Sequence, residues 1–285
     1  MYCVRVKSRD GYASRDRRGR RQMIIPRSHI SAVELSGTIG SQIRASEYAR
    51  IFDWLRDDRR VKSVLLIVDS PGGSATDSGY LQSSVAKLAE VKPVVAFVQG
   101  MAASGGYMAS SAATKIVALP SALVGSIGVI SVTPILSGLL DRLGINVEVV
   151  KSGRLKDMGS FHREPTAEER RKEQELSDEF YDDFVDSVAK FRRLERDKVK
   201  NLATGEVFTA KKALQMGLVD ELGDHNRAIE LASQLGDVPK RIVYIRPRKG
   251  FLQRLFRGFA SSMVDEVSMH LEEQLLRELR LQVRM

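Results

Sequence analysis

Ser104 is the residue of this chain whose surroundings best fit a nucleophile. It lies in the segment Gln-Gly-Met-Ala-Ala-Ser-Gly-Gly-Tyr, residues 99–107, where small residues leave its hydroxyl uncovered at the predicted turn between a strand and a helix. A serine hydroxyl attacks a carbonyl only when a nearby base takes its proton and preformed N–H donors stabilise the oxyanion. Taken alone, the segment also fits the start of a helix packed tightly on a sheet, so other parts of the chain must supply the base and the donors.

Two further segments offer these groups. Residues 64–73 read as a buried strand that runs into the turn Ser-Pro-Gly-Gly, and the amides of such a glycine turn are able to point at an oxyanion. Residues 151–157, Lys-Ser-Gly-Arg-Leu-Lys-Asp, contain Lys151 and Lys156. Both lysines are candidates for the base, and an ordinary surface lysine is the alternative for each.

A lysine acts as a base only in its uncharged form, whereas a lysine in water has a pKa of about 10.4 and is charged at neutral pH. Removal from water disfavours the charged form. We therefore expect apolar surroundings for the base, supplied by residues 93–114 and 116–140, which contain no charged side chain. Ser126, in the turn Gly-Ser-Ile-Gly, is a candidate to hydrogen-bond the uncharged amine, although an ordinary turn serine is an equal alternative.

The elements that position these motifs alternate between apolar strands and helices. The strands are continuous apolar runs, which is typical of a parallel sheet buried on both faces. We therefore predict an α/β fold with a mainly parallel sheet. The predicted strands are 30–35, 63–68, 93–98 and 147–150, and the predicted helices are 46–58, 77–90, 105–113 and 165–191.

The uncharged residues 116–140 are numerous enough to span a bilayer. They contain two prolines and three glycines and break into short β-branched runs such as residues 127–132. Buried strands and turns are therefore predicted here instead of a membrane helix. The N-terminal residues lack the apolar core of a secretory signal, so we expect a cytoplasmic or peripherally membrane-associated protein.

Composition excludes several kinds of site. Cys3 is the only cysteine, which excludes an intrachain disulfide, a thiolate metal cluster and a redox pair. The four histidines lack the spacing of metal ligands, and His162 is the one that lies close to the lysine segment in sequence. A Ser-His-Asp triad is unsupported, and we expect no metal or organic cofactor.

The net charge of +9 is concentrated near the two ends. Residues 5–27 contain nine Arg or Lys and two Asp, and residues 240–257 contain seven Arg or Lys and no acid. The rest of the chain is acidic, which argues against a uniformly basic nucleic-acid-binding surface. We interpret the basic ends as solvated tails; attachment to anionic lipid, and for the first residues part of a transit peptide, are the alternatives.

From Phe251 onward, apolar residues recur every three or four positions and predict a long amphipathic helix. Self-association is the preferred interpretation of this helix, with membrane-surface contact and core packing as alternatives. We therefore divide the chain into a basic extension (1–28), a main domain (29–248) and a helical C-terminal extension (249–285).

The order of four motifs resembles the signal peptide peptidase A (protease IV) family of serine peptidases. The motifs are Ser-Pro-Gly-Gly at 70–73, Met-Ala-Ala-Ser-Gly-Gly-Tyr at 101–107, Gly-Ser-Ile-Gly-Val at 125–129 and Lys-Ser-Gly-x-x-Lys-Asp at 151–157. The resemblance covers roughly residues 31–222 and implies the superhelix of β-β-α units found in the Clp-protease and crotonase-like superfamily. Members of the family commonly have an N-terminal membrane anchor, and none is recognised in this sequence.

The resemblance also implies roles for single residues. Ser104 would be the nucleophile and Lys156, favoured over Lys151 by the family spacing, the general base of a Ser-Lys dyad. Ser126 would support the lysine, and the amides of Gly73 and Gly105 would form the oxyanion hole.

The implied activity is that of a serine endopeptidase that cleaves extended peptides or loosened polypeptides, such as signal-peptide remnants or misfolded chains, through an acyl-enzyme. Shorter relatives assemble into rings or barrels, so a homo-oligomer is expected, and the dyad could be completed across an interface. Two alternatives come from other classes. A crotonase-like acyl-CoA enzyme would use the same glycine amides to hold a thioester enolate, and a catalytically silent membrane-associated scaffold would need no nucleophile.

Overall fold

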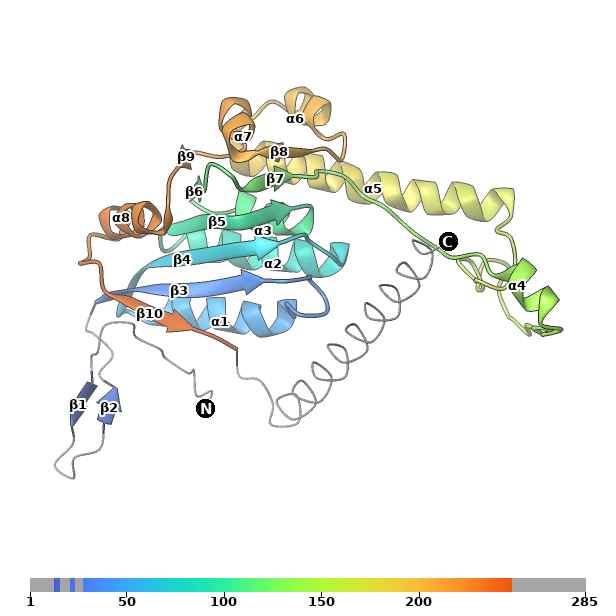
Figure 1. The fold of residues 1–285 in the computed structure, drawn as a ribbon, viewed down its shortest axis with the longest axis horizontal. Helices are drawn as coiled ribbons and strands as arrows, with labels where there is room; N and C mark the ends of the chain where they lie inside the picture. The colour runs from blue at the N-terminus through green and yellow to red at the C-terminus, as the bar shows by residue number, and fades with distance from the viewer. Residues whose placement is uncertain (1–12, 16–20, 24–27, 248–285) are drawn as a thin grey trace, which may run out of the picture. The chain divides into compact units, whose positions relative to one another are not determined.

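The computed structural model describes residues 13–15, 21–23 and 28–247 (Figure 1). Contacts group Val6–Ile245 into one compact unit, and the second unit, Met1–Arg5 with Arg246–Met285, falls almost wholly outside the described residues. The helix predicted from Phe251 and most of the basic extension therefore also lie outside the described residues. Within the extension, β1 (Ala13–Arg15) and β2 (Arg21–Met23) pair antiparallel.

The main sheet confirms the prediction of a mainly parallel α/β fold. Its central path has the order β10-β3-β4-β5-β6-β9, and each neighbouring pair along it is parallel. The short β7 pairs parallel with the end of β5 and antiparallel with β8. The strands are β3 (His29–Ser36), β4 (Val61–Ser70), β5 (Val94–Ala103), β6 (Lys115–Ala118), β7 (Leu123–Gly125), β8 (Val207–Thr209), β9 (Glu221–Leu222) and β10 (Ile242–Ile245).

Helices cover both faces of this sheet, which is why its central strands are continuous apolar runs. On one face α1 (Ala45–Asp57), α2 (Ala75–Ala89) and α3 (Gly105–Ser111) pack side by side (Figure 1). On the other face α8 (His225–Gly236) covers an apolar cluster drawn from β3, β4, β5 and β6.

Three of the sequence motifs meet at one edge of the sheet because the strands that lead into them are parallel. The glycine turn follows β4, Ser104 follows β5, and Ser126 follows β7. In sheets of this kind, ligands bind beyond the carboxyl ends of the strands. The fold therefore brings three sequence-distant loops together where a site is expected.

Two stretches that the sequence predicts as strands are not strands. Ile127 is buried but lies in no strand, and residues 128–132 and 147–150 belong to an arm, defined here as residues 128–166. The arm leaves the sheet and contains α4 (Ser137–Arg142) and the lysine segment (Figure 1). Ile130 is 87% and Val150 94% exposed. Strand propensity reflects packing against neighbours on a half-buried surface, and among the described residues no strand pairs with the arm.

The long helix α5 (Ala167–Arg192) returns from the arm to the core, close to the predicted range. Phe184 and Val188 are buried in the core, whereas Leu176 and Phe180 near the arm are 39% and 44% exposed. The apolar side chains of α5 are therefore buried only in the second half of the helix. The helices α6 (Arg196–Leu202) and α7 (Ala210–Met216) follow.

The stretch 116–140 covers most of β6, all of β7 and the first part of α4 rather than one continuous helix. Across the described part of the chain, no helix combines the length and the apolar character needed to cross a membrane.

Candidate active site

Ser104 has a backbone conformation that few side chains adopt. It joins β5 to α3 with φ 49° and ψ −123°. Its N–H donates to the carbonyl of Gly125 (2.8 Å), and its carbonyl accepts from the N–H of Met108 (2.9 Å). A strained strand-to-helix turn of this kind also exposes the nucleophile of α/β-hydrolases, and strain of this size persists only where the surroundings enforce it. The geometry therefore agrees with a hydroxyl held ready for attack.

The glycine turn after β4 packs directly against this serine. A Cβ added at Gly72 would lie 2.7 Å from the amide nitrogen of Gly105 and 2.9 Å from Cβ of Ser104. Gly72 also has φ +97°, a region that favours glycine. A glycine is therefore required here both for the backbone conformation and for the close approach of the two loops.

The N–H of Gly73 points away from Ile39, the residue whose backbone hydrogen bonds hold the glycine turn. The N–H of Ile39 donates to the carbonyl of Gly72 (2.8 Å), and the carbonyl of Ile39 accepts from Ser74 N–H (3.1 Å). These two bonds flank Gly73, and within the described residues its own N–H has no acceptor. Gly105 is the first residue of α3, where an N–H lacks an intrahelical partner. The two amides are thus suited to the oxyanion role predicted for them.

Ser70 holds the glycine turn in place, a role that the sequence did not reveal. Its hydroxyl donates to the carbonyl of Gly37 (2.7 Å) and accepts from Gly72 N–H (3.2 Å), and the residue is buried. The only available signal was its place in the Ser-Pro-Gly-Gly motif.

Ser126 lies beside Ser104. The last pair in register between β5 and β7 is Ala103 with Gly125, so each serine is the next residue of its strand. Ser126 has φ 50°, and its N–H donates to the carbonyl of Glu206 (2.7 Å). The loop before β8 therefore holds this residue through the carbonyl of Glu206.

Lys156 is not part of this cluster within one chain. It is exposed on the arm, and its N–H donates to the carbonyl of Gly153 (3.2 Å). No hydrogen bond or ion pair among the described residues joins its side chain to Ser104 or Ser126. His162, the other residue considered near this segment, lies edge-on to Phe161 with ring centroids 5.9 Å apart.

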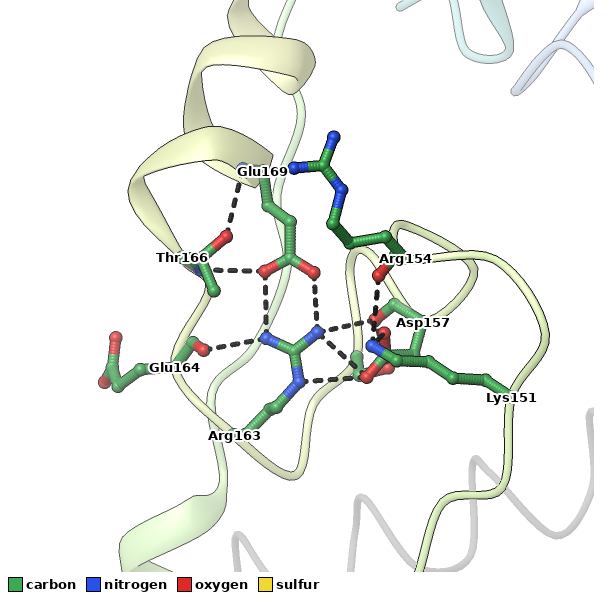
Figure 2. A network of polar contacts seen from close by, with 8 residues as sticks. Lys151, Arg154, Asp157, Arg163, Glu164, Thr166 and Glu169 are labelled. Carbon is green, nitrogen blue, oxygen red and sulfur yellow. Dashed lines mark hydrogen bonds and ion pairs between the residues drawn. The ribbon is translucent and has the colours of Figure 1, made fainter.

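Lys151, the competing base, belongs to a polar network between the lysine segment and the start of α5 (Figure 2). Its amine donates to the carbonyl of Arg154 (3.1 Å) and forms an ion pair with Asp157. The bonds from Lys151 and Arg163 lower the pKa of Asp157. These contacts occupy the amine of Lys151, which argues against this lysine as the base.

Arg163 and Glu169 form the centre of the same network. The Arg163 guanidinium donates to both oxygens of Glu169 (2.6 and 2.8 Å), and the Thr166 N–H donates to Glu169 Oε2 (2.7 Å). These bonds, with that of Arg163 the largest contribution, lower the pKa of Glu169 to about 2. The same pair raises the pKa of Arg163.

This shift predicts how stability depends on pH. Glu169 has a folded-state pKa of about 2, below its ordinary value of 4.5, so its contribution is complete above about pH 4.5 and is lost as the pH falls towards 2. In urea titrations, the difference in unfolding free energy between wild type and Glu169→Gln should therefore be constant from pH 5 to 7 and should shrink below about pH 4.5. Glu175→Gln, in an exposed ion pair with Lys172, serves as the control and should show a much smaller difference. A difference for Glu169→Gln that persists unchanged in acid would contradict this account.

Comparison with known proteins adds an independent observation. Residues 86–239, just over half of the chain, match the model of "Peptidase family S49". A protein of Methanocaldococcus jannaschii described as a protease is 42% identical over 194 residues, which cover 68% of this chain and 62% of that protein. A protein of Synechocystis described as a protease is 35% identical over 235 residues, 81% of this chain and 84% of the relative.

Longer relatives also match. Serine protease SPPA, chloroplastic, of Arabidopsis thaliana is 33% identical over 255 residues, which cover 86% of this chain but only 38% of that protein. Among solved structures, a mutant of the 1510-N membrane-bound stomatin-specific protease superposes with a TM-score of 0.51 at 16% identity, covering 79% of this chain and all of the other. The structural likeness supports the fold alone.

Proposed function

Because this chain belongs to peptidase family S49, the signal peptide peptidase A family of serine peptidases, we propose that it cleaves extended peptides or loosened polypeptides through an acyl-enzyme. The observation that supports this most directly is the strained Ser104, which lies in close contact with the glycine turn after β4. Signal-peptide remnants and misfolded chains are the substrates we infer.

In the proposed reaction, the oxygen of Ser104 attacks the peptide carbonyl carbon while the uncharged amine of Lys156 takes the hydroxyl proton. The N–H groups of Gly73 and Gly105 stabilise the resulting oxyanion, and Ser126 orients the amine. The C–N bond then breaks as the lysine passes the proton to the leaving amine. In the second half of the reaction, the lysine activates a water molecule that hydrolyses the ester on Ser104.

We further propose that the lysine reaches Ser104 from a second copy of the chain. Two features of the arm support this: Lys156 is exposed and has no contact with Ser104 among the described residues, and many apolar side chains around it are exposed. Patches of this kind mark protein interfaces, and a homo-oligomer with a closed symmetry would bury every such patch. The exposed apolar residues of the arm include Ile130, Val132, Leu139, Leu143, Ile145 and Val150.

The peptidase domain would comprise residues 29–248, and peripheral attachment to anionic membranes would involve the basic ends, most of which lie outside the described residues. Family membership supports the peptidase over an acyl-CoA enzyme or a silent scaffold.

Incubation with unfolded casein tests this function. Wild type should cleave casein and react with a fluorophosphonate probe, and Ser104→Ala should lose both activities because the attacking oxygen is gone. Circular dichroism should show that both proteins are folded. A folded wild type that neither cleaves nor reacts would overturn the proposal, and binding of CoA thioesters by that protein would favour the acyl-CoA enzyme.

A further inference from the structure

We propose that Asp157, Arg163 and Glu169 are positioning residues that fix the loop of Lys156, so that its amine is presented in one direction. This inference rests on the proposed function, because it assigns a purpose to the loop that contains the base. None of the three residues is proposed to touch the substrate. They act through the backbone next to Lys156.

Asp157, which directly follows Lys156, is held at both its side chain and its main chain (Figure 2). Its carboxylate accepts from Nε of Arg163 (3.0 Å) and pairs with Lys151. Its carbonyl accepts from the N–H (3.2 Å) and the hydroxyl (2.5 Å) of Ser160. With its neighbour fixed in this way, the Cα–Cβ direction of Lys156 is fixed as well.

Arg163 connects this loop to the start of α5. Its two terminal nitrogens bind the two oxygens of Glu169, the paired geometry that gives arginine–carboxylate contacts their strength and direction. The Glu169 side chain is only 2% exposed, and Thr166 and Glu169 cap the helix reciprocally. Phe184, in the second half of α5, is buried in the core, so this helix links the core to the network beside the lysine.

The arm needs such a connection because it has little packing of its own. A lysine has a flexible stem, and a base misplaced by about 1 Å costs about 10²-fold in rate. A loop held only by its exposed backbone would let the amine sample many positions. Catalytic side chains are held in their productive geometry by supporting hydrogen bonds of this kind. The network therefore explains how a base on an exposed arm keeps a defined orientation.

The test compares Arg163→Gln with Arg163→Lys and with a control, Lys172→Gln. The control removes one positive charge from an exposed ion pair on α5, the helix whose first turn Arg163 contacts. Hydrogen exchange at the amides of Lys156, Met158 and Ser160, all hydrogen-bonded within the loop, reports on the loop without requiring activity. Casein-derived peptides provide kcat and KM.

In Arg163→Gln, we expect these amides to exchange at least about tenfold faster and kcat to fall about 10- to 100-fold with KM little changed. Arg163→Lys should restore part of the slow exchange and part of kcat, because it keeps the charge but not the paired geometry. Lys172→Gln should match wild type in both quantities. Unchanged exchange in Arg163→Gln, or a rise in KM with kcat intact, would overturn the positioning role. Hydrogen exchange is measured independently of cleavage. An inactive wild type would therefore contradict the proposed function, whereas the exchange rates in Arg163→Gln would still show whether the network holds the loop.

Discussion

Lys156→Ala should lower kcat for peptide hydrolysis by about 10²- to 10⁴-fold, because the variant lacks the group that takes the proton from Ser104. KM should change little, since the lysine acts on the reacting hydroxyl rather than on the bound peptide. Reaction with the fluorophosphonate probe should slow as well, because it depends on the same activated oxygen.

Lys151→Ala is the matched control for this variant. Lys151 lies in the same loop and has the same charge, but its amine is paired with Asp157. We expect its loss to reduce kcat by less than about tenfold, through looser support of the loop, because Arg163 still holds the carboxylate. Full activity of Lys156→Ala together with an inactive Lys151→Ala would show that the base has been assigned to the wrong lysine.

The sequence predicts those parts of the fold and site that depend on residues close together in the chain, namely apolar runs followed by glycines and small residues. Ser104, Ser126 and the glycine turn each follow an apolar run, and parallel strands place their ends at one edge. Their conformations depend on glycines and small residues that are visible in the sequence. The parallel sheet follows from the continuous apolar runs.

The network around Arg163 could not be predicted because it depends on non-local geometry. Arg163 occurs between two helices without any motif, and its contacts with Asp157 and Glu169 exist only once the loop has folded back on α5. The Thr166–Glu169 cap was the only local signal, since that spacing is typical of a helix start.

The arm misled the sequence analysis for a different reason. Its β-branched runs predicted strands, and the uncharged stretch 116–140 was expected to surround the lysine with apolar residues. In one chain, Ile130, Val150 and Lys156 are exposed. An apolar pattern indicates that residues are buried against something but not whether that partner belongs to the same chain.

Assemblies that combine Ser104→Ala with Lys156→Ala should therefore regain activity. Each variant alone lacks one member of the dyad in every site. If the dyad forms between copies, a mixed assembly contains sites in which an intact Ser104 meets an intact Lys156 from its neighbour. With random mixing in equal amounts, about one quarter of the sites would be complete.

The measurement that tests the pairing of Ser104 with Lys156 most directly is the casein-cleaving activity of such mixed assemblies. The two variants are co-expressed with different tags and purified over both, so that every assembly contains both chains; Ser104→Ala co-expressed with the double variant Ser104→Ala/Lys156→Ala is the control. Selection over both tags removes the assemblies made of a single variant, so the account predicts about one half of the wild-type activity if the assembly is a dimer, about a quarter if it is a large ring, and none in the control. An inactive mixture whose assemblies are intact and contain both chains would contradict it.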